Sequence, residues 1–223
     1  MTSLSLAAGD WGVVDYAGNP VPGDPDAVSS LASQFVDQAG QAQERAERLT
    51  SVHASNEGHM QGNYAENFDN ILASLPAHSS ALGGAYQSCA ESLNAFANDL
   101  GTIQSQAAEA LQRGTEADAA YRAALDEFCS EVPLEFSGTG VWRGLNAATA
   151  MELAEPMAEE TENPELLDWA AEIGQYAGEA EDDRQGAIAA IGDLVSDYQD
   201  ANSRCAQAIQ NAASSVPSPV LSS

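Results

Sequence analysis

Lysine is absent from this chain: all seven basic residues are arginine, against 34 aspartate and glutamate residues, which gives a formal net charge of −27 over 223 residues. Such a surface repels phosphate backbones and anionic lipid headgroups, so we expect no nucleic-acid partner. Strong acidity also serves solubility or life in salty surroundings. The charge therefore excludes partners more than it identifies one.

Cysteine is scarce, and long apolar runs are missing. Cys89, Cys129 and Cys205 are too few and too far apart for a disulfide framework or a CxxC zinc site, so we interpret them as small packed hydrophobic residues. No apolar run reaches the roughly 18 residues of a transmembrane helix, and the first residues lack the basic region of a secretory signal peptide. We expect no membrane insertion and no cleaved export signal.

Aromatic residues make up only 6% of the chain, and much of its 44% hydrophobic content is alanine. This composition suits close helix-on-helix packing, so we predict an all-α fold: an elongated antiparallel helical hairpin or bundle of long helices. We divide the chain into an extended lead-in over residues 1–23, a helical hairpin over 24–130, a linker with a short helix over 131–163, a long C-terminal helix over 164–214 that packs on the hairpin, and a flexible tail over 215–223.

Helix signals set these boundaries. Asp24 can cap a first helix and Pro25 suits its first position, after a lead-in that is predicted to have no regular element but to dock Trp11 on the helices. Pro76 is expected to interrupt the second helix, after which a long apolar series runs to Phe128. A second start signal at 163–165 opens the last helix.

Two short motifs flank the first predicted helix. A helix-start motif precedes it, made of Pro22, Gly23, Asp24 and Pro25 after a valine. A glycine-bearing corner follows it, made of Met60, Gly62, Ala65 and Phe68.

Over about residues 20–120 these motifs resemble the WXG superfamily of type VII secretion, and more closely the N-terminal domains of secreted polymorphic toxins of Gram-positive bacteria. The family turns at Trp-X-Gly, and here Met60 stands at the tryptophan position, which keeps the apolar bulk but lacks the indole. A literal triplet occurs later at Trp142 and Gly144, and its plainer interpretation is a tryptophan at a helix start, packed on the bundle. No tyrosine is followed four places on by Asp or Glu, the export signal of related substrates.

The resemblance implies a non-enzymatic helical protein that is a secretion substrate, a targeting adaptor or a partner-chaperone. It would pair as a homodimer or a heterodimer with another small helical protein, contact the secretion machinery, and be secreted without a signal peptide or be cytoplasmic before export. The alternative from another class is a cytosolic acidic binding or inhibitory protein that is not exported, which the charge of −27 motivates.

Catalytic and cofactor signals are weak. His53, Glu57 and His59 lie close in sequence, but their spacing does not place all three on one helical face, so a solvated loop is the better interpretation. We expect no enzyme activity, no metal and no cofactor. We also interpret one acidic cluster as a solvated helix face rather than a calcium site, namely Glu179, Glu181, Asp182 and Asp183.

Overall fold

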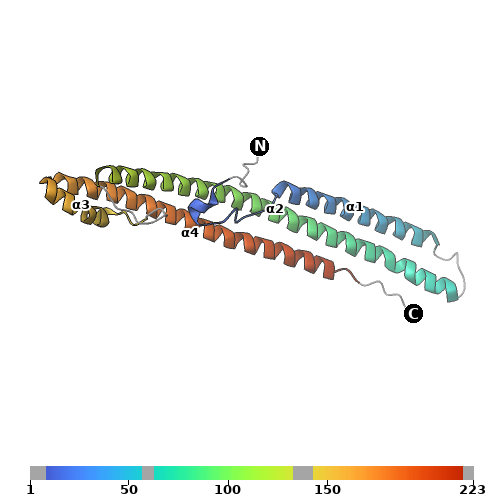
Figure 1. The fold of residues 1–223 in the computed structure, drawn as a ribbon. Helices are drawn as coiled ribbons and strands as arrows, with labels where there is room; N and C mark the ends of the chain where they lie inside the picture. Colours follow the sequence, from blue (N-terminus) through green and yellow to red (C-terminus); the bar gives the residue numbers. More distant parts are fainter. Residues whose placement is uncertain (1–8, 57–62, 133–142, 218–223) are drawn as a thin grey trace. The chain divides into compact units, whose positions relative to one another are not determined.

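The computed structural model describes residues 9–56, 63–132 and 143–217, with side chains for all of these except 56 and 63–67. Its elements are a 3₁₀ turn, η2 (Trp11–Val14), and the helices α1 (Pro25–Asn56), α2 (Asn63–Glu131), α3 (Ala147–Thr161) and α4 (Glu165–Ser214) (Figure 1). The described residues contain no strand, and the predicted all-α fold is confirmed.

Helix α1 begins where its start signal predicts. The Asp24 carboxylate accepts hydrogen bonds from the backbone N–H of Asp26, at 3.0 Å, and of Ala27, at 3.1 Å. Pro25 occupies the first helical position, where a missing N–H costs nothing. The cap satisfies amide groups that the first turn of any helix leaves without an intrahelical partner.

The predicted interruption at Pro76 is wrong, because α2 continues through this residue from Asn63 to Glu131. A proline inside a helix loses one hydrogen bond and crowds the carbonyl four residues earlier, at a cost of about 3 kcal/mol. Leu72, four residues before it, is buried, and the helix continues to bury apolar residues far beyond the proline. Tertiary packing over so long an element offsets a local cost of this size.

The lead-in holds one regular element that the sequence did not predict, the turn η2. The Asp10 side chain caps it by accepting a hydrogen bond from the Gly12 N–H, and Asp15 closes it in the left-handed region with φ 63°. Trp11 is buried, as expected from its predicted docking on helices.

Helix α3 lies within the stretch predicted to hold a short helix, and α4 follows its predicted start signal. Asn146 and Thr149 form a reciprocal capping box at the start of α3, and α4 begins at Glu165, within the predicted start signal. Between them the chain turns at Glu162, whose φ of 53° is left-handed.

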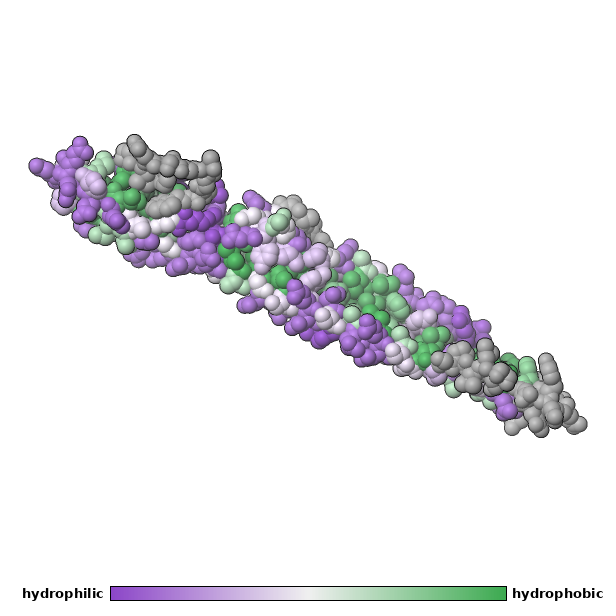
Figure 2. All heavy atoms as spheres, turned by 60° about the horizontal axis from the view of Figure 1, so that its bottom comes forward, coloured by the Kyte–Doolittle hydropathy of each residue, from purple (hydrophilic) through white to green (hydrophobic). Residues whose placement is uncertain are grey.

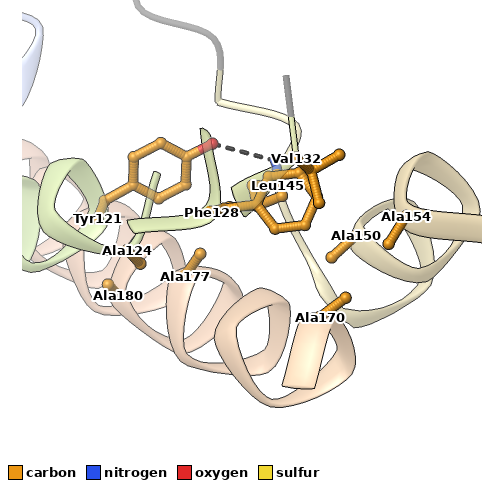
Figure 3. Packing of buried hydrophobic residues seen from close by; sticks show 10 residues of the cluster. All are labelled: Tyr121, Ala124, Phe128, Val132, Leu145, Ala150, Ala154, Ala170, Ala177 and Ala180. Atoms are coloured by element: carbon orange, nitrogen blue, oxygen red, sulfur yellow. Dashed lines mark hydrogen bonds between the residues drawn. The ribbon is translucent and has the colours of Figure 1, made fainter. Parts of the chain in front are cut away.

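The chain forms two compact units, and α2 and α4 contribute residues to both. Unit 1 comprises residues 1–22 and 104–196, and unit 2 comprises 23–103 and 197–223. In unit 1, α2, α3 and α4 contribute to an alanine-rich core around Phe128 (Figure 3). Phe128 also stacks on Trp169, with 5.9 Å between the ring centroids. In unit 2, α1, α2 and α4 share a core around Ala32, Leu93 and Cys205. Within each unit, α2 and α4 pack antiparallel, as predicted.

Candidate functional site

The candidate site with the clearest sequence signals is the α1–α2 hairpin of unit 2, and its start depends on a glycine. Gly23 has a φ of 135°, and a Cβ at this position would lie 2.9 Å from Leu100 Cδ2. Only glycine meets both conditions without strain. Asp24 and Pro25 then start α1 as described, while Pro22, before them, is exposed.

The glycine-bearing corner falls between the end of α1 and the beginning of α2. Met60 and Gly62 lie outside the described residues, and Ala65 lies in α2 with its side chain outside them. Phe68 also lies in α2, and 43% of its surface is exposed. The structure therefore locates the predicted helix reversal without describing how its four residues meet.

The seam of the hairpin is built from small residues. Ser79 Oγ donates a hydrogen bond of 2.8 Å to the Ala42 carbonyl, and a Cβ on Gly83 would lie 3.3 Å from the Ala39 carbonyl oxygen. Further along, His53 Nε2 lies 3.2 Å from the Asp69 carboxylate. Together these contacts show that α1 and α2 run antiparallel with closely approaching backbones (Figure 1).

Large apolar side chains remain exposed on the hairpin. Ile71 is 58% exposed and Leu75 39% on α2, and Val52 is 47% exposed on α1. A hollow of about 370 Å³ lies beside Val52, with Leu49, Ser79, Arg45 and Arg48 as its other lining residues. Figure 2 shows hydrophobic side chains exposed in several places among hydrophilic ones. An apolar hollow flanked by arginines suits an apolar side chain that carries a carboxylate beside it.

The second WXG triplet belongs to unit 1. Trp142 lies outside the described residues, whereas Arg143 and Gly144 lie within them. The Arg143 guanidinium lies 5.6 Å from the centroid of the Tyr121 ring, and the Gly144 carbonyl accepts a 2.7 Å hydrogen bond from Thr149. Tyr121 Oη accepts a 3.1 Å hydrogen bond from the Leu145 N–H (Figure 3). The triplet precedes α3, which starts at Ala147, and the predicted packing of Trp142 lies outside the described residues.

Arg143 also belongs to an ion-pair network that the sequence did not reveal. It donates hydrogen bonds to Asp118 and, at 3.1 Å, to Glu181. Glu181 in turn accepts hydrogen bonds of 3.0 and 2.8 Å from Arg184, whose side chain is only 5% exposed. Arg184 reaches the lead-in through a 2.9 Å hydrogen bond to the Val13 carbonyl.

Ionisation in this network follows from these contacts. Burial by itself raises the pKa of Glu181, but the hydrogen bonds from Arg184 and Gln185 outweigh it and lower the pKa to about 2. The hydrogen bond to Glu181 likewise raises the pKa of Arg184. These charges hold the lead-in against α4 within unit 1.

Asp118 behaves in the same way. Burial by itself raises the pKa of Asp118, but the hydrogen bonds from Arg143 and Arg122 outweigh this effect, so the pKa lies below its ordinary value. Tyr121 differs, because burial dominates and raises the pKa of its hydroxyl.

The interpretation of the acidic cluster as a solvated face is wrong for Glu181, which is partly buried and paired. It holds for Glu179, Asp182 and Asp183, which are exposed. The available signal was Arg184, a charged residue in the apolar series of α4 with Glu181 one helical turn before it.

Metal sites, membrane-spanning helices and matches to known proteins were the remaining sources of a candidate site. Within residues 9–56, 63–132 and 143–217, no group of three or more His, Cys, Asp and Glu residues could hold a metal ion. Over the same residues, no helix has the length and apolarity needed to cross a membrane. No family model, no curated protein and no solved structure matches the chain.

Proposed function

We propose that this is a non-enzymatic, type VII secretion-associated helical protein that acts through helix–helix recognition, as a substrate, a targeting adaptor or a partner-chaperone. The observation that carries the proposal is the antiparallel α1–α2 hairpin with exposed apolar residues on its helices. Large exposed apolar residues such as Ile71 and Leu75 are expected where a partner binds.

The helix-start motif supports the same proposal. The Val-Pro-Gly-Asp-Pro sequence leads into α1 through a glycine with φ 135° and a capping aspartate. In the WXG-like secretion domains that the chain resembles, the same sequence leads into the first helix of a hairpin. The partner would be another small helical protein, in a heterodimer or a homodimer, and secretion would proceed without a signal peptide.

Export is tested in the native host by fractionating cells and culture medium, with the type VII secretion ATPase intact or inactivated. We expect the protein in the medium only when the ATPase is active. A Gly62→Val variant tests the corner, because a bulky residue there should impair helix reversal and reduce export. Protein found only inside cells with an active apparatus would overturn the export proposal.

The alternative is an acidic binding or inhibitory protein that stays in the cytosol. The exposed carboxylates of Glu179, Asp182 and Asp183, on a chain of net charge −27, favour it. It predicts a basic protein partner and complexes that weaken steeply as salt rises, whereas apolar helix pairing is less sensitive to salt. Salt-dependent pull-downs with a defined partner therefore separate the two proposals.

A further inference from the structure

The α4-facing stripe of α2 continues past the end of α4. Phe68, Leu75, Leu82, Cys89 and Phe96 recur every seven residues along α2. The last two pack into cores to which α4 contributes, whereas Phe68 and Leu75 remain 43% and 39% exposed. Residues seven apart lie on one face of packed helices, so the exposed members continue the surface on which α4 lies.

Helix α1 shows the same continuity. Val28, Phe35, Ala42 and Leu49 recur every seven residues. Val28 and Phe35 pack around Cys205 of α4, while Leu49 lines the hollow beside Val52. Ser79 lines the hollow too and bonds to the Ala42 carbonyl, so the hollow lies over the α1–α2 seam. Both helices thus continue their α4-binding faces beyond Ser214, where α4 ends.

We propose that this groove, between Leu49 and Val52 of α1 and Phe68 to Leu82 of α2, binds an amphipathic α-helix of a partner protein with acidic residues along the edge that faces α1. The proposal rests on the proposed function, because both require a helical partner. It adds where that helix lies and which charges flank it.

The shape of the occupant follows from α4. Where the same two faces are covered in unit 2, the covering element is a helix antiparallel to α2. The stretch of α2 from Phe68 to Leu82 spans about 14 residue steps along the helix, or roughly 21 Å. A helix this short is marginal alone in water, so a folded partner must present it.

The arginines beside the groove favour a partner helix with acidic residues along one edge. Arg45 and Arg48 line the hollow on the α1 side, and the Arg48 side chain is 79% exposed beside Glu44. Carboxylates on the partner would face these guanidinium groups. A second copy of the chain is a poorer occupant, because each copy carries a net charge of −27 and the two repel.

The probe is a stapled helical peptide with the sequence of residues 197–214, because that part of α4 already fits these two faces. Cys205 is replaced by serine to prevent oxidation. Arg204 pairs with Asp99 of α2 at 3.1 Å, so Ala206, two residues on, lies on the opposite edge, toward α1. Ala213 follows seven residues later on the same edge. Two forms of the peptide are compared, one with Ala206→Glu and Ala213→Glu and one with lysine at both positions.

Each peptide is titrated into the isotope-labelled full chain at about 0.15 M salt, where charges beyond about 8 Å are screened. We expect amide shifts confined to the groove residues of α1 and α2, with micromolar dissociation constants suited to a small interface. The glutamate form should bind about three-fold to ten-fold more tightly than the lysine form, and an Arg45→Glu, Arg48→Glu variant should reverse this order.

Matched substitutions test the location. Val52→Glu and Leu75→Glu should abolish the shifts, whereas Val36→Glu should not, although Val36 is 44% exposed on the same helix as Val52. Absent shifts, shifts elsewhere, or tighter binding of the lysine form to wild type and Arg variant alike would overturn the proposal.

Other occupants give different results. A concentration-dependent dimer that Leu75→Glu dissolves would make a second copy the occupant, and groove shifts on deletion of residues 217–223 would make it the chain's own C-terminal segment. Either result overturns the partner-helix proposal. The peptide titration is independent of secretion, so its failure is distinguishable from failure of export.

Discussion

Two glycines in α4 should respond oppositely to the same substitution. Replacing glycine by alanine inside a helix ordinarily stabilises it by about 1 kcal/mol. At Gly186 no atom lies within 4 Å of the added Cβ, so Gly186→Ala should give this gain. At Gly174 the added Cβ would lie 2.5 Å from the Asn146 carbonyl oxygen and 2.6 Å from Ala150 Cβ, at the start of α3.

The Gly174→Ala clash involves backbone, which cannot rotate away as a flexible side chain can. Overpacking of this kind costs about 1–3 kcal/mol, which cancels or exceeds the helix-propensity gain. We therefore expect Gly174→Ala to be less stable than Gly186→Ala by about 1–3 kcal/mol, the difference between equal propensity gains and unequal packing costs.

Urea denaturation followed by far-UV circular dichroism measures the difference. The midpoints should separate while the slopes stay equal, because neither change alters the surface exposed on unfolding. Equal stabilisation by both alanines would refute the packing of α3 on α4 at Gly174.

Three further predictions concern the ion-pair network of unit 1 and the Tyr121 hydroxyl next to it. The pKa of Glu181 is lowered to about 2, so its contribution to stability should be complete above the unfolded-state pKa and be lost as pH falls from about 4.5 toward 2. Urea denaturation at several pH values should show the free energy of unfolding fall by about 3 kcal/mol over this range. The Glu181→Gln variant should lack this fall. Arg143→Met removes one of the cationic partners from each of two partly buried carboxylates and should cost about 1.5–3 kcal/mol, whereas Arg122→Met, at a half-exposed side chain, should cost under about 1 kcal/mol; equal midpoints in urea would contradict this. Tyr121→Phe removes the acceptor of a buried N–H and should cost about 1–3 kcal/mol, with faster hydrogen exchange at the Leu145 amide; unchanged exchange would count against the bond.

Much of the fold could be predicted from local signals. Asp24 and Pro25 mark the start of α1 because capping depends on adjacent residues, and the all-α class follows from alanine content and apolar spacing. The local cost of Pro76 favours a break in the helix, but the seven-residue apolar series from Phe68 to Phe96 continues on both sides of it, and α2 is unbroken.

The candidate site was harder to predict because it depends on contacts between distant residues. The pairing of Asp118 with Arg143 joins α2 to a segment 25 residues away. The residues around each of these two positions do not predict that they pair. The groove on the hairpin depends on which residues of α1 and α2 lie beyond the end of α4, and the sequence of α4 does not predict this position. The start of α1 was predictable because capping depends on a short stretch of chain, whereas Met60 and Gly62 of the corner lie outside the described residues, so the arrangement of the corner stays a prediction.

The measurement that tests the central claim most directly is export of matched variants from the native host. Wild type, Leu75→Glu and Val36→Glu are expressed at equal levels, and the protein in the culture medium is quantified with the type VII secretion ATPase active or inactive. We predict ATPase-dependent export of wild type and Val36→Glu, and loss of export for Leu75→Glu. Equal amounts of all three variants in the medium, or retention of wild type inside cells with an active ATPase, would contradict recognition through the α1–α2 hairpin.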